Sequence, residues 1–362
     1  MPFHASPMFP GDLYDTTLRV AATAAVTETF QAQEPSATWS QFLALGWQAV
    51  LVAEDLGGAG ASLGDVAAIA EAAGRYALPA PLVARCAVVP SLLAGLPGQP
   101  VAEALLREVA TGAASVCPVL DAAPGTIAGR VQGERLLLDG SLRGADLTEP
   151  ATHFLFIAHE PAGDALLVLA PRDALPGQAR SYLGLDARQT VDIAVAGIEL
   201  PLSCVLARGA AVAALVERAR AVGALIACAQ TVGAIGAMIE QTIDYLSARQ
   251  QFGVALSTFQ ALRHKVVEMY VAYENARGLV RQLVLALDAR GDAVLRQVSL
   301  AKLYLSVTGR QVAEATIQLH GGIGMSRELP AARLAMHALS CSLQWGDRFA
   351  QLDRLAAEPV LH

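Results

Sequence analysis

Hydrophobic and polar positions change their spacing twice along this chain. From residue 12 to about 110, apolar residues recur at helical intervals in segments separated by Gly and Pro clusters. Between about 113 and 205 they gather into short runs spaced by Gly, Pro and Asp, which is typical of antiparallel strands joined by turns. The pattern therefore predicts a helical block followed by a small β-domain.

Beyond residue 207 the helical spacing returns in longer segments. We predict helices over about 208–249, 257–289, 292–318 and 328–356. Such lengths suit an antiparallel bundle in which Ala and Gly allow close helix contacts.

The expected fold class is therefore mainly α with a central β-domain. We expect three domains along the chain: an N-terminal helical domain (1–112), a middle antiparallel β-domain (113–205) and a C-terminal four-helix bundle (206–362).

Composition narrows the class of protein. Hydrophobic residues make up 54% of the chain and charged residues 16%, which suggests that other subunits cover part of its surface. We expect no apolar run to reach the roughly 18 charge-free residues of a membrane span, and so predict no membrane insertion. A net charge of −7 argues against nucleic-acid binding. No export signal is visible at the N-terminus, so a cytoplasmic location is expected.

The P-loop motif and the metalloprotease motif are missing, and so are the signs of a metal site. The sequence contains no GxxxxGK[ST] and no HExxH. The five cysteines show no CxxC spacing, so neither a zinc site nor a disulfide framework is indicated.

Two helix breaks carry unusual polar residues. At the first, Arg249 and Gln251 end a long helix, Phe252-Gly253 turns, and Gln260 begins the next helix. An arginine there can present its planar guanidinium to a phosphate pair, although an exposed arginine on an ordinary turn fits the same spacing. At the second, Gln318 and His320 precede Gly321 and Gly322 in "IQLHGGIGMSRE". Such a loop exposes main-chain N–H groups to an anion, or simply ends a helix.

Taken together, the two breaks resemble the acyl-CoA dehydrogenase family. The motifs are Arg-x-x-Phe-Gly with Phe-Gln, and about 60 residues later Gln-x-His-Gly-Gly-x-Gly. The resemblance extends over nearly the whole chain, including "LGWQAVLVAEDLGGAGASLGDVAAIAEAAGRYALPAPLV", "LLLDGSLRGAD" and "VAGIELPLSCVL". It implies a flavoprotein of that fold, with FAD bound between subunits.

The resemblance also implies a role for each motif residue. Arg249 would reach the FAD pyrophosphate, with Phe252 lining the adjacent surface and Gln260 near the dinucleotide. Gln318, Gly321 and Gly322 would offer side-chain and main-chain contacts across the subunit interface. Gln251, beside Arg249, would be a further cofactor-binding residue. The implied reaction is α,β-desaturation of an acyl-CoA substrate: a carboxylate removes the Cα proton and a hydride moves from Cβ to the flavin. An electron-transfer flavoprotein would then reoxidise the flavin.

The catalytic base departs from the family pattern. The two positions at which family members carry the glutamate fall on Trp345 and Gly223. Glu217 and Asp347 are the nearby acids, and both are more typical of solvated or salt-bridged groups. The family's Thr-Glu-Pro-x-x-Gly-Ser-Asp segment has no counterpart, because "LTEP" at 147–150 occurs too late in the chain.

These losses leave three hypotheses open. The pattern resembles the smaller subunit of heteromeric acyl-CoA dehydrogenases, in which a larger partner of a heterotetramer supplies the glutamate. A self-sufficient homo-oligomeric enzyme with an atypical base, for which Glu217 is the candidate, is the second hypothesis. The third is a flavin-free structural partner on the same fold.

Overall fold

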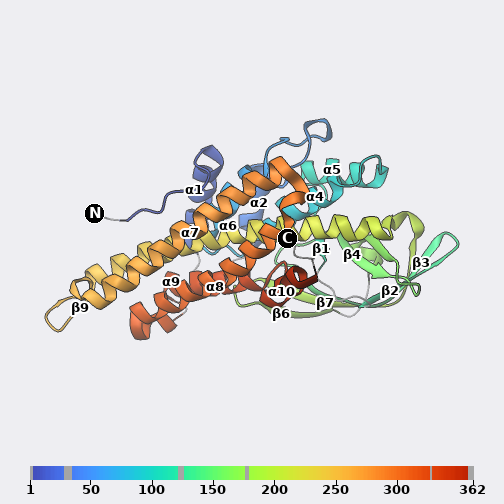
Figure 1. Cartoon of the computed structure of the whole chain (residues 1–362). Coiled ribbons are helices and arrows are strands. Elements are labelled where there is room, and N and C mark those ends of the chain that lie inside the picture. Colours follow the sequence, from blue (N-terminus) through green and yellow to red (C-terminus); the bar gives the residue numbers. More distant parts are fainter. Residues whose placement is uncertain (1–2, 28–34, 121–125, 176–178, 327, 358–362) are drawn as a thin grey trace, which may run out of the picture. The chain divides into compact units, whose positions relative to one another are not determined.

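The computed structural model describes residues 3–27, 35–120, 126–175, 179–326 and 328–357 (Figure 1). The chain forms two compact units. Unit 1 comprises Met1–Glu34, Leu63–Leu78 and Ala224–His362, and unit 2 comprises Pro35–Ser62 and Pro79–Gly223. The chain therefore passes between the units several times. The domain boundaries expected from the sequence, at residues 112 and 205, stay a prediction.

The first third of the chain is helical, as predicted. Its helices are α1 (Asp12–Thr27), α2 (Pro35–Ala44), α3 (Leu63–Gly74), α4 (Val89–Ala94) and α5 (Pro100–Thr111), with one π-helical segment at Val83–Val88. In α5, Pro100 occupies the first helical position and the Gln99 side chain accepts the Val101 N–H. Pro there gives up only an N–H that would have no helical partner.

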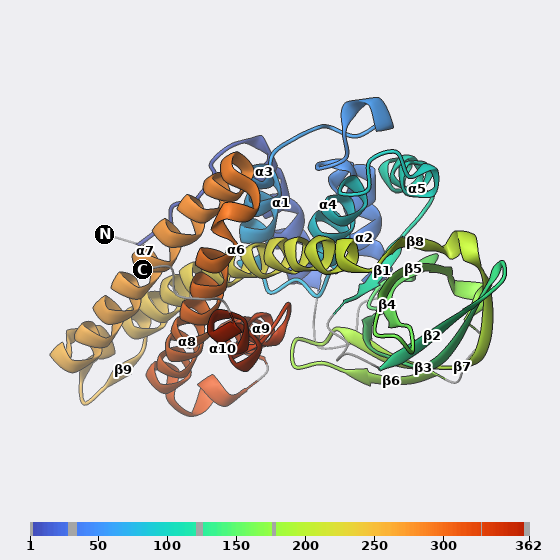
Figure 2. The same ribbon diagram turned by 45° about the vertical axis from the view of Figure 1, so that its right-hand side comes forward.

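The middle of the chain forms one eight-stranded sheet, which curls strongly in Figure 2. The strands are β1 (Val116–Val119), β2 (Ile127–Gln132), β3 (Arg135–Asp146), β4 (His153–His159), β5 (Ala165–Pro171), β6 (Ala179–Leu183), β7 (Gln189–Pro201) and β8 (Val205–Arg208). Their order is β6-β7-β3-β2-β4-β5-β8, with β1 beside β4. Most pairs are antiparallel, as expected, whereas β4 pairs in parallel with β1 and β2.

The C-terminal helices confirm a mainly helical end, with one correction. They are α6 (Ala210–Ala248), α7 (Gln260–Arg290), α8 (Leu295–His320), α9 (Pro330–Leu343) and α10 (Arg348–Ala357). The single helix predicted over 328–356 is wrong, because the chain turns at Trp345 and Gly346, where φ is 57° and 91°. An α-helix cannot continue through positive φ values.

The expectation that no apolar run is long enough to span a membrane is also wrong. Helix α6 contains an 18-residue window of mean hydropathy 1.9, and that window is entirely buried. A helix that is apolar on all sides fits the centre of a protein as well as a membrane. Burial therefore accounts for this composition, and the cytoplasmic location remains a prediction.

Small residues set the distance between α3 and α6 in unit 1. A Cβ added to Gly74 would lie 2.2 Å from the Gln230 main-chain oxygen, and one added to Gly233 would lie 2.0 Å from that of Glu71. Neither space can hold a methyl group. The glycines therefore allow direct contact between the two helix backbones, as the Ala- and Gly-rich sequence predicts.

Candidate functional site

The break after α6 forms a small β-hairpin. Strands β9 (Gln250–Gln251) and β10 (Val254–Ala255) pair antiparallel around Phe252 and Gly253, which have φ values of 56° and 80°. Positive φ at both central residues is the geometry of a tight hairpin turn. In Figure 1 this hairpin lies at the end of α6 and α7. The sequence had predicted the turn but not its strands.

The hairpin exposes the residues that the resemblance singles out. Phe252 is 90% exposed, and its ring meets that of Phe259 edge to face at 6.1 Å. The side chains of Arg249, Gln251 and Gln260 are exposed as well. No ion pair within the described residues involves Arg249. Its charge is therefore directed to solvent or to a group outside this chain.

The second break is an open helix end. Gly321 ends α8 with φ 64°, and its N–H donates to the Gln318 main-chain oxygen. A Cβ added to Gly321 or Gly322 would meet no atom within 4 Å, whereas one added to Gly324 would lie 2.5 Å from the Ile317 oxygen. Gln318 is exposed. The double glycine thus has open space beside it, and the third glycine is required by packing.

An aromatic contact joins the two breaks. The rings of Tyr245 and His320 have centroids 4.6 Å apart with planes tilted by 30°. Tyr245 lies one helical turn before Arg249, and His320 directly precedes Gly321. Both elements belong to unit 1. The structure therefore brings together two motifs that are far apart in the sequence.

This group of residues fits a dinucleotide phosphate. A guanidinium, three carboxamides and the main-chain N–H groups of an open glycine loop can all donate to phosphate oxygens. Phe252 adds an exposed aromatic face. On the chemistry of these donors, Arg249 with Gln251, Gln260, Gln318, Gly321 and Gly322 could hold part of FAD.

The turn at Trp345 offers no base. Trp345 is only 9% exposed, and the fully buried Gln351 donates through Nε2 to the main-chain oxygens of Trp345 and Gly346, at 3.2 Å each. Asp347 accepts the Ala350 N–H at 2.9 Å and so caps α10. Its carboxylate stabilises a helix end.

The alternative base position holds no carboxylate either. Gly223 is buried within α6, and Glu217 on the same helix is exposed. Glu217 therefore stays an untested candidate.

Unit 2 contains a cation whose burial the sequence did not indicate. Arg85 is 4% exposed and donates to the main-chain oxygens of Glu149, at 2.5 Å, and Pro150, at 3.1 Å. Its guanidinium lies 5.3 Å from the Trp39 ring centroid. Burial lowers the pKa of Arg85, with Cys117 and Asp146 opposing that shift. These contacts explain how a charge is accommodated in the interior.

Glu149 is the most perturbed acid beside it. Burial raises the pKa of the Glu149 carboxyl to about 7, against the lowering effect of Arg85. This residue lies in "LTEP", which occurs too late in the chain to be the family's Thr-Glu-Pro segment. Only its burial distinguishes it from a surface glutamate, and the sequence carries no signal of that.

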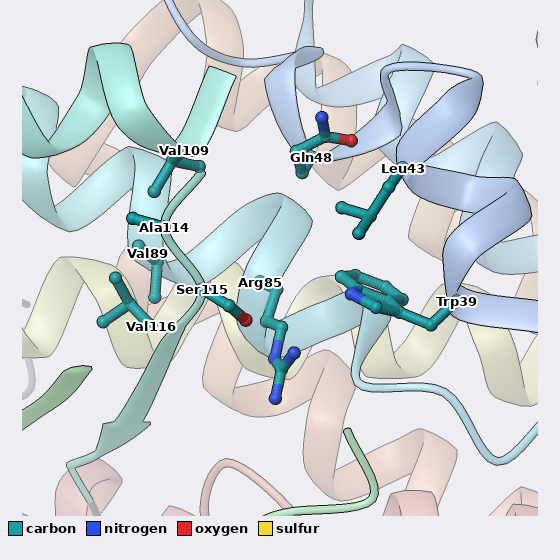
Figure 3. A pocket seen from close by; sticks show the side chains of 9 residues that line it. All are labelled: Trp39, Leu43, Gln48, Arg85, Val89, Val109, Ala114, Ser115 and Val116. Carbon is teal, nitrogen blue, oxygen red and sulfur yellow. The ribbon is translucent and has the colours of Figure 1, made fainter. Parts of the chain in front are cut away.

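Arg85 also lines a small cavity with Trp39, Gln48 and Ser115 (Figure 3). The cavity measures about 10 Å³, room for about one water molecule. Gln48 Oε1 and Ser115 Oγ are buried without a hydrogen-bond partner in the described part of the chain. This cavity is far too small for a flavin or an acyl chain.

Two helical regions flank a β-domain along the chain, and the Tyr245–His320 contact joins the arginine hairpin to the glycine-rich helix end. This is the arrangement that the resemblance predicts. Residues 213–358 match the family "Acyl-CoA dehydrogenase, C-terminal domain". In this region the chain is therefore similar to the acyl-CoA dehydrogenase family of oxidoreductases, as its motifs predicted.

Three known proteins illustrate the similarity. A probable short/branched chain specific acyl-CoA dehydrogenase of Dictyostelium discoideum is 31% identical over 34% of this chain, which spans 30% of that protein. Acyl-CoA dehydrogenase IpdE2 of Mycolicibacterium smegmatis is 26% identical over 87% of this chain and 85% of its own length. The ChsE4-ChsE5 complex from Mycobacterium tuberculosis shares the fold, with a TM-score of 0.84, 19% identity and coverage of 98% of this chain and 100% of that one.

Proposed function

We propose that this chain is the smaller subunit of a heteromeric, FAD-dependent acyl-CoA dehydrogenase. One contrast carries the proposal. The cofactor-contact residues Arg249 and Gly321-Gly322 are exposed and joined by the Tyr245–His320 contact, whereas both base positions hold buried residues without a carboxylate, Trp345 and Gly223. The chain is thus suited to bind a shared cofactor and to leave proton abstraction to a partner.

In this proposal the chain's own residues bind and orient. Arg249 pairs with the pyrophosphate, and the open main chain at Gly321 and Gly322 contacts the same region of FAD. Gln251, Gln260 and Gln318 add carboxamide contacts, and Phe252 excludes water from one side. FAD, when bound, supplies the hydride acceptor for α,β-desaturation of an acyl-CoA.

The partner is a larger acyl-CoA dehydrogenase subunit in a heterotetramer. The ChsE4-ChsE5 complex supports such a pairing, because its name joins two components and its fold matches this chain. The partner would supply the carboxylate base, because losing a positioned base costs on the order of 10²- to 10⁴-fold in rate. An electron-transfer flavoprotein is the expected electron acceptor.

The experiment is to purify the chain alone and together with its chromosomal neighbour, and to record flavin absorbance and mass in solution. A colourless chain that forms a yellow, acyl-CoA-reducible complex with the neighbour supports the proposal. A chain that is yellow alone and bleaches with acyl-CoA would instead be a self-sufficient homo-oligomer, and Glu217→Gln would then test its base. A complex without flavin would identify a structural partner.

A further inference from the structure

A ring contact links the two halves of the proposed cofactor surface. Tyr245 belongs to the last turns of α6 and His320 to the last turn of α8, and their ring centroids are 4.6 Å apart. Aromatic pairs at this separation stabilise beyond the area that they bury. The contact therefore ties the end of one helix to the end of another.

The His320 ring is held in one orientation. It is 3% exposed, and Nδ1 lies 2.8 Å from the Thr316 main-chain oxygen. Because a carbonyl oxygen can only accept, Nδ1 must carry the hydrogen and donate it. Thr316 is fixed in turn, since its hydroxyl donates to the Val312 oxygen at 2.8 Å. The ring is thus a rigid extension of α8, directly before the open glycines.

The Tyr245 side is linked to the hairpin through the main chain. The main-chain oxygen of Tyr245 accepts the Arg249 N–H at 2.8 Å, and the main-chain oxygen of Arg249 accepts the Leu256 N–H at 2.8 Å. The first bond completes the end of α6, and the second closes the base of the hairpin. A displacement of Tyr245 would therefore be passed to Arg249.

We propose that Tyr245 and His320 are positioning residues, which fix the Arg249 hairpin relative to the Gly321-Gly322 loop. The proposed function enters only in naming FAD as what this surface binds. Neither side chain is assigned a contact with the cofactor. Their role is to fix the separation between a cationic donor and a set of main-chain donors, because a ligand held by both needs them at a constant distance.

The test is amide hydrogen exchange in the full-length chain, read on the element that was not mutated. We expect His320→Ala to speed exchange of the Arg249 and Leu256 amides about three- to tenfold, and Tyr245→Ala to do the same at residues 321–324. The double variant should add little to either single change. Tyr304→Ala is the matched control, since this tyrosine is 38% exposed and lies roughly 24 Å along α8 from His320.

Conservative variants separate positioning from general stability. Tyr245→Phe keeps the ring and should leave exchange at the glycine loop unchanged. Since truncating buried His320 also costs core packing, the half-buried Tyr245 provides the second, milder variant. Unchanged exchange across the contact in folded Tyr245→Ala and His320→Ala proteins would overturn the inference.

A separate measurement tests the role toward FAD. In the assembled protein, Tyr245→Ala should weaken FAD binding by a similar three- to tenfold factor, whereas Tyr245→Phe should not. Exchange coupling in a protein that binds no FAD would leave the positioning role standing and defeat the proposed function. FAD binding without exchange coupling would leave the proposed function standing and overturn the positioning role.

Discussion

The hairpin after α6 and the turn between α9 and α10 both link helices of unit 1, yet they are built in opposite ways. The hairpin exposes Phe252 almost fully and leaves Arg249 outside any ion pair of the described residues. The turn buries Trp345 and satisfies its main-chain oxygens through Gln351. The difference separates a surface suited to something outside this chain from a segment that completes its own core.

The largest expected effect on stability concerns the buried turn at Trp345. Trp345→Ala should lower the free energy of unfolding by about 3 kcal/mol, because a large buried ring leaves a cavity. Phe349→Ala is the control four residues away, where the side chain is 71% exposed and a change within about 0.5 kcal/mol is expected. Urea denaturation measures both. Equal losses would mean that Trp345 does not belong to the core.

A buried carboxyl group, that of Glu71, predicts that the stability of the protein depends on pH. Glu71 is 2% exposed and accepts the Met8 N–H at 2.8 Å, and burial raises the pKa of its carboxyl from 4.5 to about 7. A raised carboxyl pKa means that the folded state holds the proton more tightly than the unfolded chain. This contribution is therefore complete below about pH 4.5 and is lost as the pH rises to about 7, in total about 3 kcal/mol.

Glu71→Gln isolates that contribution. Relative to the variant, the wild-type protein should lose stability between pH 5 and pH 8, as followed by urea denaturation at both values. A constant difference between the two proteins would show that Glu71 titrates normally in the folded state.

A change in the exposed hairpin should affect FAD binding and leave the stability of the protein unchanged. Arg249→Gln should weaken FAD binding by the assembled protein about 100-fold, because two charge-assisted hydrogen bonds are lost. Its thermal midpoint without FAD should not change. Arg310→Gln, an exposed arginine paired with Glu314 on α8, is the matched control and should leave FAD affinity intact. An Arg249 variant that binds FAD normally would contradict the proposed contact.

The smallest effects come from two glycines of one loop. Gly324→Ala should cost about 2 kcal/mol of stability, since its Cβ would lie 2.5 Å from the Ile317 oxygen. Gly322→Ala meets no atom within 4 Å, so it should leave stability nearly unchanged and affect only a bound ligand. Thermal denaturation compares the two variants. Equal losses of stability would contradict the inference that Gly324 is required by packing and Gly322 is not.

Sequence by itself determined the order of the elements and the two unusual breaks. Apolar spacing is a local property, so it identified the β-domain and the helical regions on both sides of it. Gly253 and Gly321 were visible because turns with positive φ favour glycine. Helix α6 shows the limit of composition, since its apolar window reads equally well as a core helix or a membrane span.

Only the tertiary structure decided what lies next to what. The Tyr245–His320 contact joins helix ends that are distant in the chain, and no local pattern marks either ring as a partner of the other. The turn at Trp345 was missed because its stabilisation comes from Gln351, a residue that otherwise looks like an ordinary helix member. The burial of Arg85 and Glu149 was missed for the same physical reason: burial depends on elements that assemble around a residue, and the sequence records only the residue itself.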